Sequence, residues 1–529
     1  MENMADDQLP KDIVALQQLL MSTQQELSEH KKQLAAKDKK IHKLQQLLSA
    51  FEEQRRLALA RQFAPSSEKE ALQYRLFDEA EAGMAETDAD DGTEPEVPHT
   101  KVKAHQRRGG RRALPESLPR VEIEHDLSET EEQCECGCQK ERIGEETSEQ
   151  IDIIPAKVQV LKHIRYKYAC KHCDTAPQTA PMPPQPIPKS QASPGFLAYI
   201  ATSKYADALP LYRQCSILAC SGIDYARNTL CLQIVKAGEL LQPLINLMQD
   251  QPLAYPILQM DETTVQVLNE PGRAAHNQSY MWVMRGGPPD KRSVIYHYDP
   301  SRGQQVVLRL LSGYQGHLQT DAWQAYEAIH SDAVIAVGCW AHARRKFKDA
   351  EKAQGKKASP KLMQAIAYIQ KLYAVEKSVK DSRPNERLNA RQKNSLPILD
   401  KFKNWLDKQN VNPASKLGEA IQYTLKYWDR LTVYCTDGRV EIDNNATENK
   451  IRPFAVGRKN WLFSNSQAGA KASANLYGLI ETAKEHGLNE YAYLRWVFTY
   501  LPAVQSVEDI EQLLPWNVDP LKIVNWAYA

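Results

Sequence analysis

The sequence has almost no net charge and no long apolar run. Its 67 basic and 66 acidic residues leave a formal charge of +1, so bulk charge does not indicate a nucleic-acid partner. The acidic first residues, MENMADDQLPK, contain no apolar segment, so we expect no secretory signal. No apolar run approaches the length that spans a bilayer, so we expect no membrane partner.

Cysteine is sparse, with ten residues in 529, and five of the ten lie between positions 134 and 173. Such clustering favours metal binding in a reducing compartment over a disulfide framework, and it predicts a cytoplasmic protein. A chain of 529 residues also exceeds what one hydrophobic core serves, so we expect three or more modules in a multidomain α+β protein.

Glycine and proline are absent from residues 11–64, where apolar side chains recur at every seventh position. The repeating positions are Ile13, Leu20, Leu27, Leu34, Ile41 and Leu48. A second seam, three residues further on, is polar in its middle. The pattern predicts a coiled-coil helix over 1–64 that joins chains into a homodimer or a larger assembly. The alternative is a long amphipathic helix that packs on its own protein.

Charge is strongly segregated after this helix. Residues 78–96 contain no Lys or Arg, whereas residues 101–112 contain no acid. We therefore predict an acidic and then basic linker over 65–118, whose basic part is either a solvated tail or an arm that follows DNA phosphates. The arginines proposed to contact DNA in this arm are Arg107, Arg108, Arg111 and Arg112.

The cysteine cluster predicts a small zinc-ribbon-like module over 119–176. Cys170 and Cys173 form a C-x-x-C pair, which supplies two corners of a tetrahedral zinc site. The other corners come from Cys134, Cys136 and Cys138, whose C-x-C-x-C spacing leaves the choice open, so four of the five cysteines bind structural Zn²⁺. Five free thiols in a small β module are the alternative.

A proline-rich linker over 177–194 precedes a helical region over 195–250. Within it, a helix over 209–220, a turn over 221–223 and a helix over 224–235 capped by Asp224 form a helix-turn-helix pattern. Arg227 and Asn228 lie near the start of the second helix, where they are expected to contact DNA. Helical hairpins that bind no DNA share this pattern.

Residues 251–485 alternate short apolar strands with helices, which predicts an α/β domain with a helical insertion at about 349–437. Asp261 follows the strand YPILQM, and Asp321 closes the strand GHLQT. Glu448 lies on a predicted helix that could pack on the sheet. Three carboxylates that meet would suit two Mg²⁺ ions (or Mn²⁺) that act on a phosphodiester, although most such acids are solvated residues or turn caps.

Basic residues surround these acids in the sequence. Residues 449–480 contain no acid and are interleaved with aromatic side chains, as a DNA-binding surface requires, although a solvated helix face is the alternative. The proposed contacts in this part of the chain are Arg344, Arg345, Lys346, Arg452, Arg458 and Lys459.

Four segments together resemble the transposases of the insertion sequence 66 family, often called TnpC. They are MDETTVQVL, LQTDAW, GCWAHARRKF and DNNATENKIRPFAVGRKNWLF. The likeness continues upstream through RQFAPSSEK, QYRLFDEAE, GRRALPESLPR, the cysteine module, KYADALPLYRQ and SRGQ, so it covers most of the chain.

The resemblance implies a bacterial DDE transposase with an RNase H-like catalytic core. By motif, the first Asp of such a core is Asp261 on the first strand, the second is Asp321 after the fourth strand, and the Glu is Glu448 on a later helix. Glu441 and Asp443 are nearby rivals for the third carboxylate. The resemblance also implies two small accessory proteins. The residue pattern itself predicts a C-terminal helical tail over 486–529.

The predicted function is binding of the terminal inverted repeats of an insertion sequence, followed by metal-dependent cleavage and transfer into target DNA. Two other functions stay open. One is a non-catalytic DNA-binding repressor derived from a transposase, which would bind DNA without cutting it. The other is a nuclease of the same fold that cuts without joining.

Overall fold

The computed structural model describes residues 12–62, 158–168, 178–321, 323–331, 333–355 and 358–528. These residues belong to two units, one drawn from 1–90 and 182–529 and the other from 91–181. The basic arm and all five clustered cysteines lie outside the described residues. Among the described helices, none is long and apolar enough to cross a membrane.

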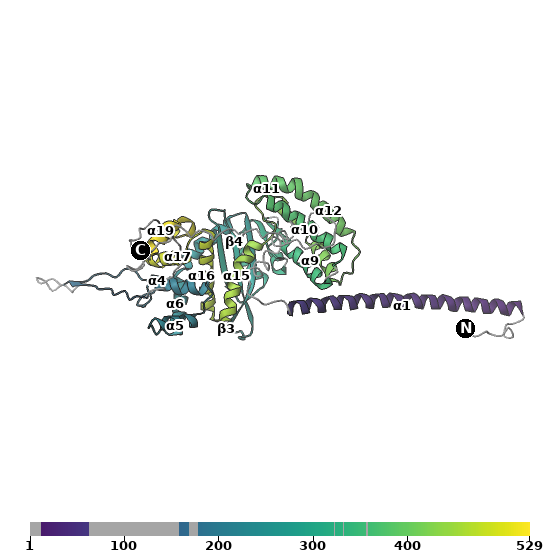
Figure 1. Ribbon diagram of the computed structural model, residues 1–529, viewed down its shortest axis with the longest axis horizontal. Coiled ribbons are helices and arrows are strands. Elements are labelled where there is room, and N and C mark those ends of the chain that lie inside the picture. The colour runs from purple at the N-terminus through teal and green to yellow at the C-terminus, as the bar shows by residue number, and fades with distance from the viewer. Residues whose placement is uncertain are drawn as a thin grey trace, which may run out of the picture. The chain divides into compact units, whose positions relative to one another are not determined.

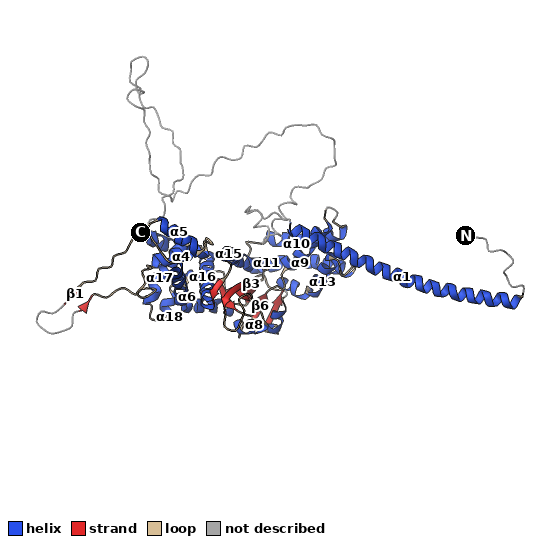
Figure 2. Cartoon of the chain, turned by 90° about the horizontal axis from the view of Figure 1, so that it is seen from below, coloured by secondary structure: helices blue, strands red, loops and turns tan. Residues whose placement is uncertain are grey.

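A mixed β-sheet forms the centre of the larger unit (Figures 1 and 2). Its strands run in the order β5-β4-β3-β6-β7, and a short strand β8 pairs with β3. β4 is antiparallel to both β3 and β5, whereas β6 is parallel to β3 and to β7. The strands are β3 (Ile257–Asn269), β4 (Gln278–Gly286), β5 (Ser293–Asp299), β6 (Gly316–Gln319), β7 (Val334–Val337) and β8 (Ser464–Ser466).

Helices cover both faces of this sheet. Ser293 and Tyr296 of β5 point to opposite faces, because successive side chains of a strand alternate. Ser293 Oγ donates to the carbonyl of Met248 on α7 (Gln242–Ala254) at 3.0 Å. On the other face, Tyr296 stacks on Tyr477 of α16 (Gln467–Glu485), with ring centroids 5.6 Å apart. Its hydroxyl also donates to the carbonyl of Lys450 on α15 (Asn445–Trp461). Helix α8 (Gln304–Leu310) and the 3-10 helix η2 (Gln324–Ile329) follow β5 and β6 in the chain.

The helices before and after the sheet share its main hydrophobic core. Helix α4 (Pro194–Tyr205) begins where Ser193 Oγ accepts a hydrogen bond from the N–H of Phe196, with proline at the first helical position. Buried residues of α4 and of α17 (Glu490–Tyr500) belong to this core. The core also includes Ile187 of the expected linker and Ile523 of α19 (Pro520–Tyr528), so both chain segments pack on the unit. The short helix α18 spans Val507–Glu511.

The expected helix-turn-helix consists of α5 (Leu211–Cys220) and α6 (Arg227–Leu240). The second helix was predicted to start at Asp224, and this boundary was wrong. Ala226 precedes the helix without a side-chain cap, and Asp224 lies in the extended segment before it. The reason is Tyr225, whose ring lies 5.4 Å from that of Phe196 and whose hydroxyl accepts from Gln233. This contact keeps the segment out of the helix.

A second hydrophobic core lies among the helices that connect β7 with α15. Its largest buried side chains include Trp340, Phe347 and Phe402. The elements are α9 (Trp340–Gln354), α10 (Pro360–Ser378), α11 (Pro384–Ala390), the π-helix η3 (Arg391–Ser395), α12 (Leu396–Asp407), α13 (Lys416–Lys426), α14 (Trp428–Thr432) and the 3-10 helix η4 (Val433–Cys435). We call this group the insertion helices.

Helix α1 (Ile13–Gln62) is a single helix of 50 residues. The apolar side chains of its seven-residue repeat are exposed, from 52% for Ile41 to 72% for Ile13. Near its end, Ala50 and Leu57 are buried, and α1 contacts α9 and α13. The carboxylate of Glu53 accepts a hydrogen bond from the N–H of Lys416 at 2.9 Å. One end of α1 therefore packs on the insertion helices while its apolar repeat is uncovered.

The second unit contributes one described hairpin. Strands β1 (Lys167–Tyr168) and β2 (Gln178–Thr179) pair in antiparallel fashion. Arg165 Nε donates to the carbonyl of Ala180 at 2.6 Å and extends this pairing.

Candidate active site

Two neighbouring strands position Asp261 and Asp321. Gln259 of β3 is the register partner of Gln319 of β6, and the two side chains form a hydrogen bond of 2.8 Å. Asp261 and Asp321 each lie two residues beyond this pair. The parallel direction of the strands therefore carries both acids toward the same edge of the sheet.

Asp261 lies inside β3 and not at its end. We expected a strand that stops before this residue, but β3 continues to Asn269 and pairs Asp261 with Val283 of β4. The polar run DETT remains extended because β4 pairs with its whole length. Asp321 follows β6, as expected, and accepts a hydrogen bond from the N–H of Trp323 at 3.0 Å.

The first turn of α15 places Glu448 over β3. Asn444, just before the helix, donates through Nδ2 to the carbonyl of Met260 at 3.2 Å. Thr447 Oγ1 donates to Gln259 Oε1 at 3.1 Å. Both contacts lie beside Asp261 in β3, so the helix is fixed where Glu448 approaches the two aspartates.

The charges of Asp321 and Glu448 act on the buried carboxylate of Asp261. Burial raises the pKa of Asp261 well above its usual value, and the charges of Glu262, Asp321 and Glu448 raise it further. Since a Coulomb interaction weakens with separation, Asp321 and Glu448 both lie near Asp261. Among the described residues, however, the metal-ligating side chains with ligand atoms within 4.8 Å of one another are Cys339, His342 and Glu448, so a shared metal site of the three acids stays a prediction.

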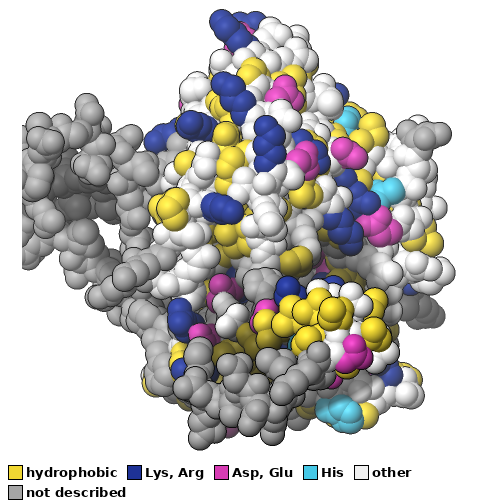
Figure 3. Space-filling model, turned by 90° about the vertical axis from the view of Figure 1, so that its right-hand side faces the viewer, with side chains coloured by type: hydrophobic (Ala, Val, Ile, Leu, Met, Phe, Trp, Pro, Cys, Tyr) yellow, Lys and Arg dark blue, Asp and Glu magenta, His cyan; other side chains and the backbone are white. Residues whose placement is uncertain are grey.

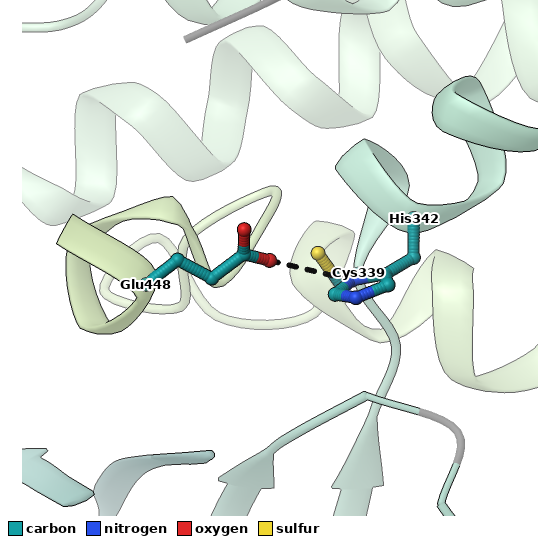
Figure 4. A group of neighbouring side chains, drawn as sticks. All are labelled: Cys339, His342 and Glu448. Atoms are coloured by element: carbon teal, nitrogen blue, oxygen red, sulfur yellow. Dashed lines mark ion pairs between the residues drawn. The ribbon is translucent and has the colours of Figure 1, made fainter. Parts of the chain in front are cut away.

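Glu448 is held by two residues of the first turns of α9. Arg345 Nη2 lies 3.0 Å from Glu448 Oε2, and His342 Nδ1 lies 3.5 Å from Oε1 (Figure 4). Burial raises the pKa of Glu448, while Arg345 opposes that rise. Burial and the charge of Arg345 lower the pKa of His342 to about 4, so this imidazole is neutral at pH 7.

The rival carboxylates are engaged elsewhere. Glu441 accepts from Gln259 Nε2 at 3.2 Å and lies 3.8 Å from Arg285. Asp443 accepts from the hydroxyl of Tyr373 at 2.7 Å and from the N–H of Asn445 at 3.1 Å. Burial raises the pKa of Asp443 to about 7. These contacts hold the carboxylates of Glu441 and Asp443 just before α15 begins.

Glu262 is a fourth acid that the sequence reasoning missed. Its side chain, 1% exposed, pairs with Arg302 at 2.6 Å and accepts from the hydroxyl of Tyr326 at 2.6 Å. Strand alternation turns it to the face opposite Asp261. Burial raises the pKa of Glu262, and the charge of Asp321 contributes to that rise. Its position directly after Asp261 was the available signal.

The basic residues expected to bind DNA fall into two groups. Arg344 is buried at 2% exposure, and Arg458 donates to Thr264 Oγ1 at 2.7 Å, which joins α15 to β3. Arg344 and Arg458 thus serve the packing of the fold, and Arg345 pairs with Glu448. Lys346, Lys459, Arg227 and Asn228 are exposed, and Arg452 is half-buried. Lys and Arg side chains are mixed with acids on the face shown in Figure 3.

A small hollow lies beside Asp321, at the junction of the sheet with the insertion helices. Its lining includes Thr320, Cys339, Tyr423 and Arg430. Close by in the chain, Trp323 is 39% exposed, and the guanidinium of Arg302 lies 3.7 Å from its ring centroid. The acidic group thus borders on cationic and aromatic side chains.

Comparison with known protein families gives matches along most of the chain. The model described as Transposase IS66 family matches residues 189–472, and the zinc-finger binding domain of transposase IS66 matches residues 131–174. The IS66 C-terminal element matches residues 478–516, and the model described as Transposase C of IS166 homeodomain matches residues 50–123.

Similar proteins occur in Sinorhizobium fredii. The uncharacterized protein y4qI is 30% identical over 97% of this chain and 98% of its own length. The uncharacterized protein y4jD is 33% identical over 76% of this chain and 81% of its own length.

Proposed function

Since this chain belongs to the IS66 family of transposases, we propose that it is a DDE transposase whose metal ligands are Asp261, Asp321 and Glu448. Membership implies DNA binding, a divalent metal and a zinc-binding module. The observation that supports the residue assignment is the register of β3 and β6, which carries Asp261 and Asp321 to the same edge of the sheet, with Glu448 near enough for its charge to act on Asp261.

The sheet supports an RNase H-like core. Five strands in the order β5-β4-β3-β6-β7, with only β4 reversed, place the first strand at the centre and the fourth beside it. In this arrangement the first Asp lies on the central strand and the second lies after its parallel neighbour. The insertion helices lie between the last strand and the helix that carries Glu448, where we expected a helical insertion at about 349–437, although α9 already begins at Trp340.

The donor set suits hard divalent cations. Three carboxylates gathered in a partly buried group repel one another, and a cation bound between them relieves that repulsion. We propose Mg²⁺ or Mn²⁺, two ions, which when bound activate the attacking oxygen and stabilise the leaving oxygen at phosphorus.

The residues of this chain hold the acids in place for that chemistry. β3 and β6 fix the two aspartates on one rigid sheet, and Arg345 orients one oxygen of Glu448. Lys346, Arg452 and Lys459 are proposed to contact DNA phosphates beside the acids. The buried Arg344 and the structural Arg458 are left out of that set.

We propose recognition of the element's ends by the other modules. The exposed Arg227 and Asn228 at the start of α6 lie where a recognition helix reads base edges. The homeodomain description of the model over 50–123 supports DNA contact near the basic arm. Four of the five clustered cysteines are proposed to bind Zn²⁺, and α1 to pair two chains through its exposed repeat.

Substitution of the aspartates tests the enzyme assignment. Asp261→Asn and Asp321→Asn each weaken one metal ligand with little change in shape. Cleavage of labelled DNA that carries the element's ends should fall about 100-fold or more in Mg²⁺ or Mn²⁺, because metal stabilisation of the transition state is worth several kcal/mol. Binding of the same DNA, measured by gel shift, should change little.

Asp250→Asn serves as the control, since this acid is exposed on α7. It should cleave as the unmodified chain does. Retained cutting by both Asp261 and Asp321 variants would discredit the assignment. Zinc-dependent binding without any cutting by the unmodified chain would instead favour a DNA-binding repressor, and cutting without joined products would favour a nuclease.

A further inference from the structure

A second group of metal-ligating side chains meets at Glu448. Three side chains that can ligate a metal are those of Cys339, His342 and Glu448. One ligand atom from each lies within 4.8 Å of the other two. Figure 4 shows the thiol, the imidazole and the carboxylate facing one another between the start of α9 and the first turn of α15. This group includes sulfur and nitrogen, unlike the all-oxygen group of the proposed active site.

Two buried atoms of this group lack a hydrogen-bond partner. Glu448 Oε1 and His342 Nδ1 are both buried, and neither has a hydrogen-bond partner among the described residues. The Glu448 side chain as a whole is 7% exposed. Oε2 of the same carboxylate is taken by Arg345. A buried carboxylate oxygen and an imidazole nitrogen that face each other at 3.5 Å are stabilised by a proton or a cation between them.

The spacing of these atoms is close to that around zinc. Tetrahedral Zn²⁺ with nitrogen and oxygen ligands at about 2.0–2.1 Å and sulfur at about 2.3 Å separates its ligands by roughly 3.3–3.6 Å. His342 Nδ1 and Glu448 Oε1 are already 3.5 Å apart. The thiol lies within 4.8 Å of the other two ligand atoms, so a shift of roughly 1–1.5 Å or less completes three corners.

We propose that Cys339, His342 and Glu448 form a binding site for a borderline transition ion such as Zn²⁺, which is distinct from the zinc module and shares only Glu448 with the proposed magnesium site. The sulfur and nitrogen ligands select such an ion over Mg²⁺, which prefers oxygen. Three protein ligands leave a fourth position for water.

An ion at this site would compete with the active site for Glu448. The same Oε1 that faces His342 is the carboxylate oxygen not held by Arg345. Zinc bound here therefore withdraws a ligand that the proposed function assigns to Mg²⁺. The site itself does not depend on that assignment, since it rests on the three side chains alone.

Metal counting on the full chain tests the site. Cys339→Ser and His342→Gln are each compared with Cys435→Ser, which alters another buried free cysteine outside the group. After equilibration in buffered Zn²⁺ and removal of free ion, elemental analysis should give one zinc ion fewer per chain in the first two variants than in Cys435→Ser. Equal zinc in all three would overturn the proposal.

Cobalt gives a second readout. With Co²⁺ in place of Zn²⁺, thiolate-to-cobalt absorption should be weaker in Cys339→Ser than in Cys435→Ser, because one cysteine ligand is lost. Equal absorption would argue against sulfur at this site. His342 is more exposed than Cys339, so its variant keeps the test valid if the serine variant folds poorly.

Asp261→Asn separates this proposal from the enzyme assignment. It should lose cleavage and keep the full zinc content, since Asp261 is not a member of the group. Full cleavage in that variant would refute the catalytic role and leave the zinc result standing. If Cys339→Ser and His342→Gln hold as much zinc as Cys435→Ser, the site at Cys339, His342 and Glu448 is refuted and the catalytic result stands.

Discussion

The protonation of Asp261 depends on the charges around it more than on any hydrogen bond it makes. Its carboxylate accepts a hydrogen bond from the N–H of Glu262 at 2.8 Å, which lowers the pKa. Burial and the neighbouring acids raise the pKa by more than that. Since only an ionised carboxylate binds metal well, metal binding and cleavage should weaken as the pH falls through the raised pKa of Asp261.

Glu262→Gln should change how the cleavage rate depends on pH. The acid limb of that profile, where the rate falls as the pH falls, should move to lower pH. Glu262 is the strongest charge acting on Asp261, and its removal lowers the pKa of Asp261 toward the usual value. The ionised form then persists to lower pH. The measurement is the cleavage rate against pH at fixed Mg²⁺.

Glu327→Gln is the matched control, because Glu327 also pairs with an arginine, Arg430, at 2.6 Å. It should leave the acid limb where it is. An acid limb that stays fixed or rises in Glu262→Gln would contradict the electrostatic account of Asp261.

The motifs point to Asp261, Asp321 and Glu448 as candidate metal ligands, and that assignment stays a prediction. The sequence does not show all of the neighbours of these acids. Cys339 and His342 stand three residues apart at the start of a helix, which is visible in the sequence. Their meeting with Glu448, more than a hundred residues later, depends on how α9 and α15 pack and has no local signal.

At the level of elements, the residues at which strands and helices begin and end were the hardest feature to predict. The polar run in β3 suggested a break at Asp261, but pairing with β4 keeps the strand extended through that run. The start of α6 shifted from Asp224 to Arg227 because a tertiary contact of Tyr225 opposes the local cap signal. The types of most elements followed from periodicity, since burial of one face imposes it.

Helices α6 and α16 approach closely at Gly238. A Cβ added there would lie 2.5 Å from both Cα and Cβ of Ala472. Gly238→Ala must therefore push the helices apart, and we expect a loss of about 1–3 kcal/mol in the free energy of unfolding. Urea unfolding followed by tryptophan fluorescence measures it.

Gly469→Ala on α16 is the control for this substitution. The nearest atom to its added Cβ is Ser466 Oγ at 3.6 Å, which is ordinary contact. Alanine in a helix is favoured over glycine by up to about 1 kcal/mol, so this variant should be unchanged or more stable. A Gly238→Ala variant as stable as this control would show that the helices can separate freely.

At the level of the whole molecule, the apolar repeat of α1 is the clearest surface for a second chain. A double variant, Leu27→Glu with Leu34→Glu, places charges in the repeat, where the side chains are 57% and 65% exposed. Each leucine buried in a dimer contributes about 1.5–3 kcal/mol, so dissociation should be favoured about 100-fold or more. Sedimentation equilibrium measures the mass.

The paired control is Leu19→Glu with Leu47→Glu, two leucines outside both seams that are 44% and 54% exposed. It should keep the mass of the unmodified chain. If the seam variant and the control have the same mass, α1 is not the contact between chains, and the alternative of a helix that serves only its own protein gains support.

The docking of α1 on the insertion helices has a mechanical consequence. The carbonyl of Gln46 accepts a hydrogen bond from Asn412, and the carboxylate of Glu53 accepts one from the N–H of Lys416 at the start of α13. Helix α13 packs on α9, and α9 carries Arg345, which pairs with Glu448. In the proposed dimer, torsion imposed on α1 by the second subunit would pass along these packed helices to Glu448. Two subunits coupled this way would cut both ends of the element in synchrony, and an isolated subunit would be slow to cut either.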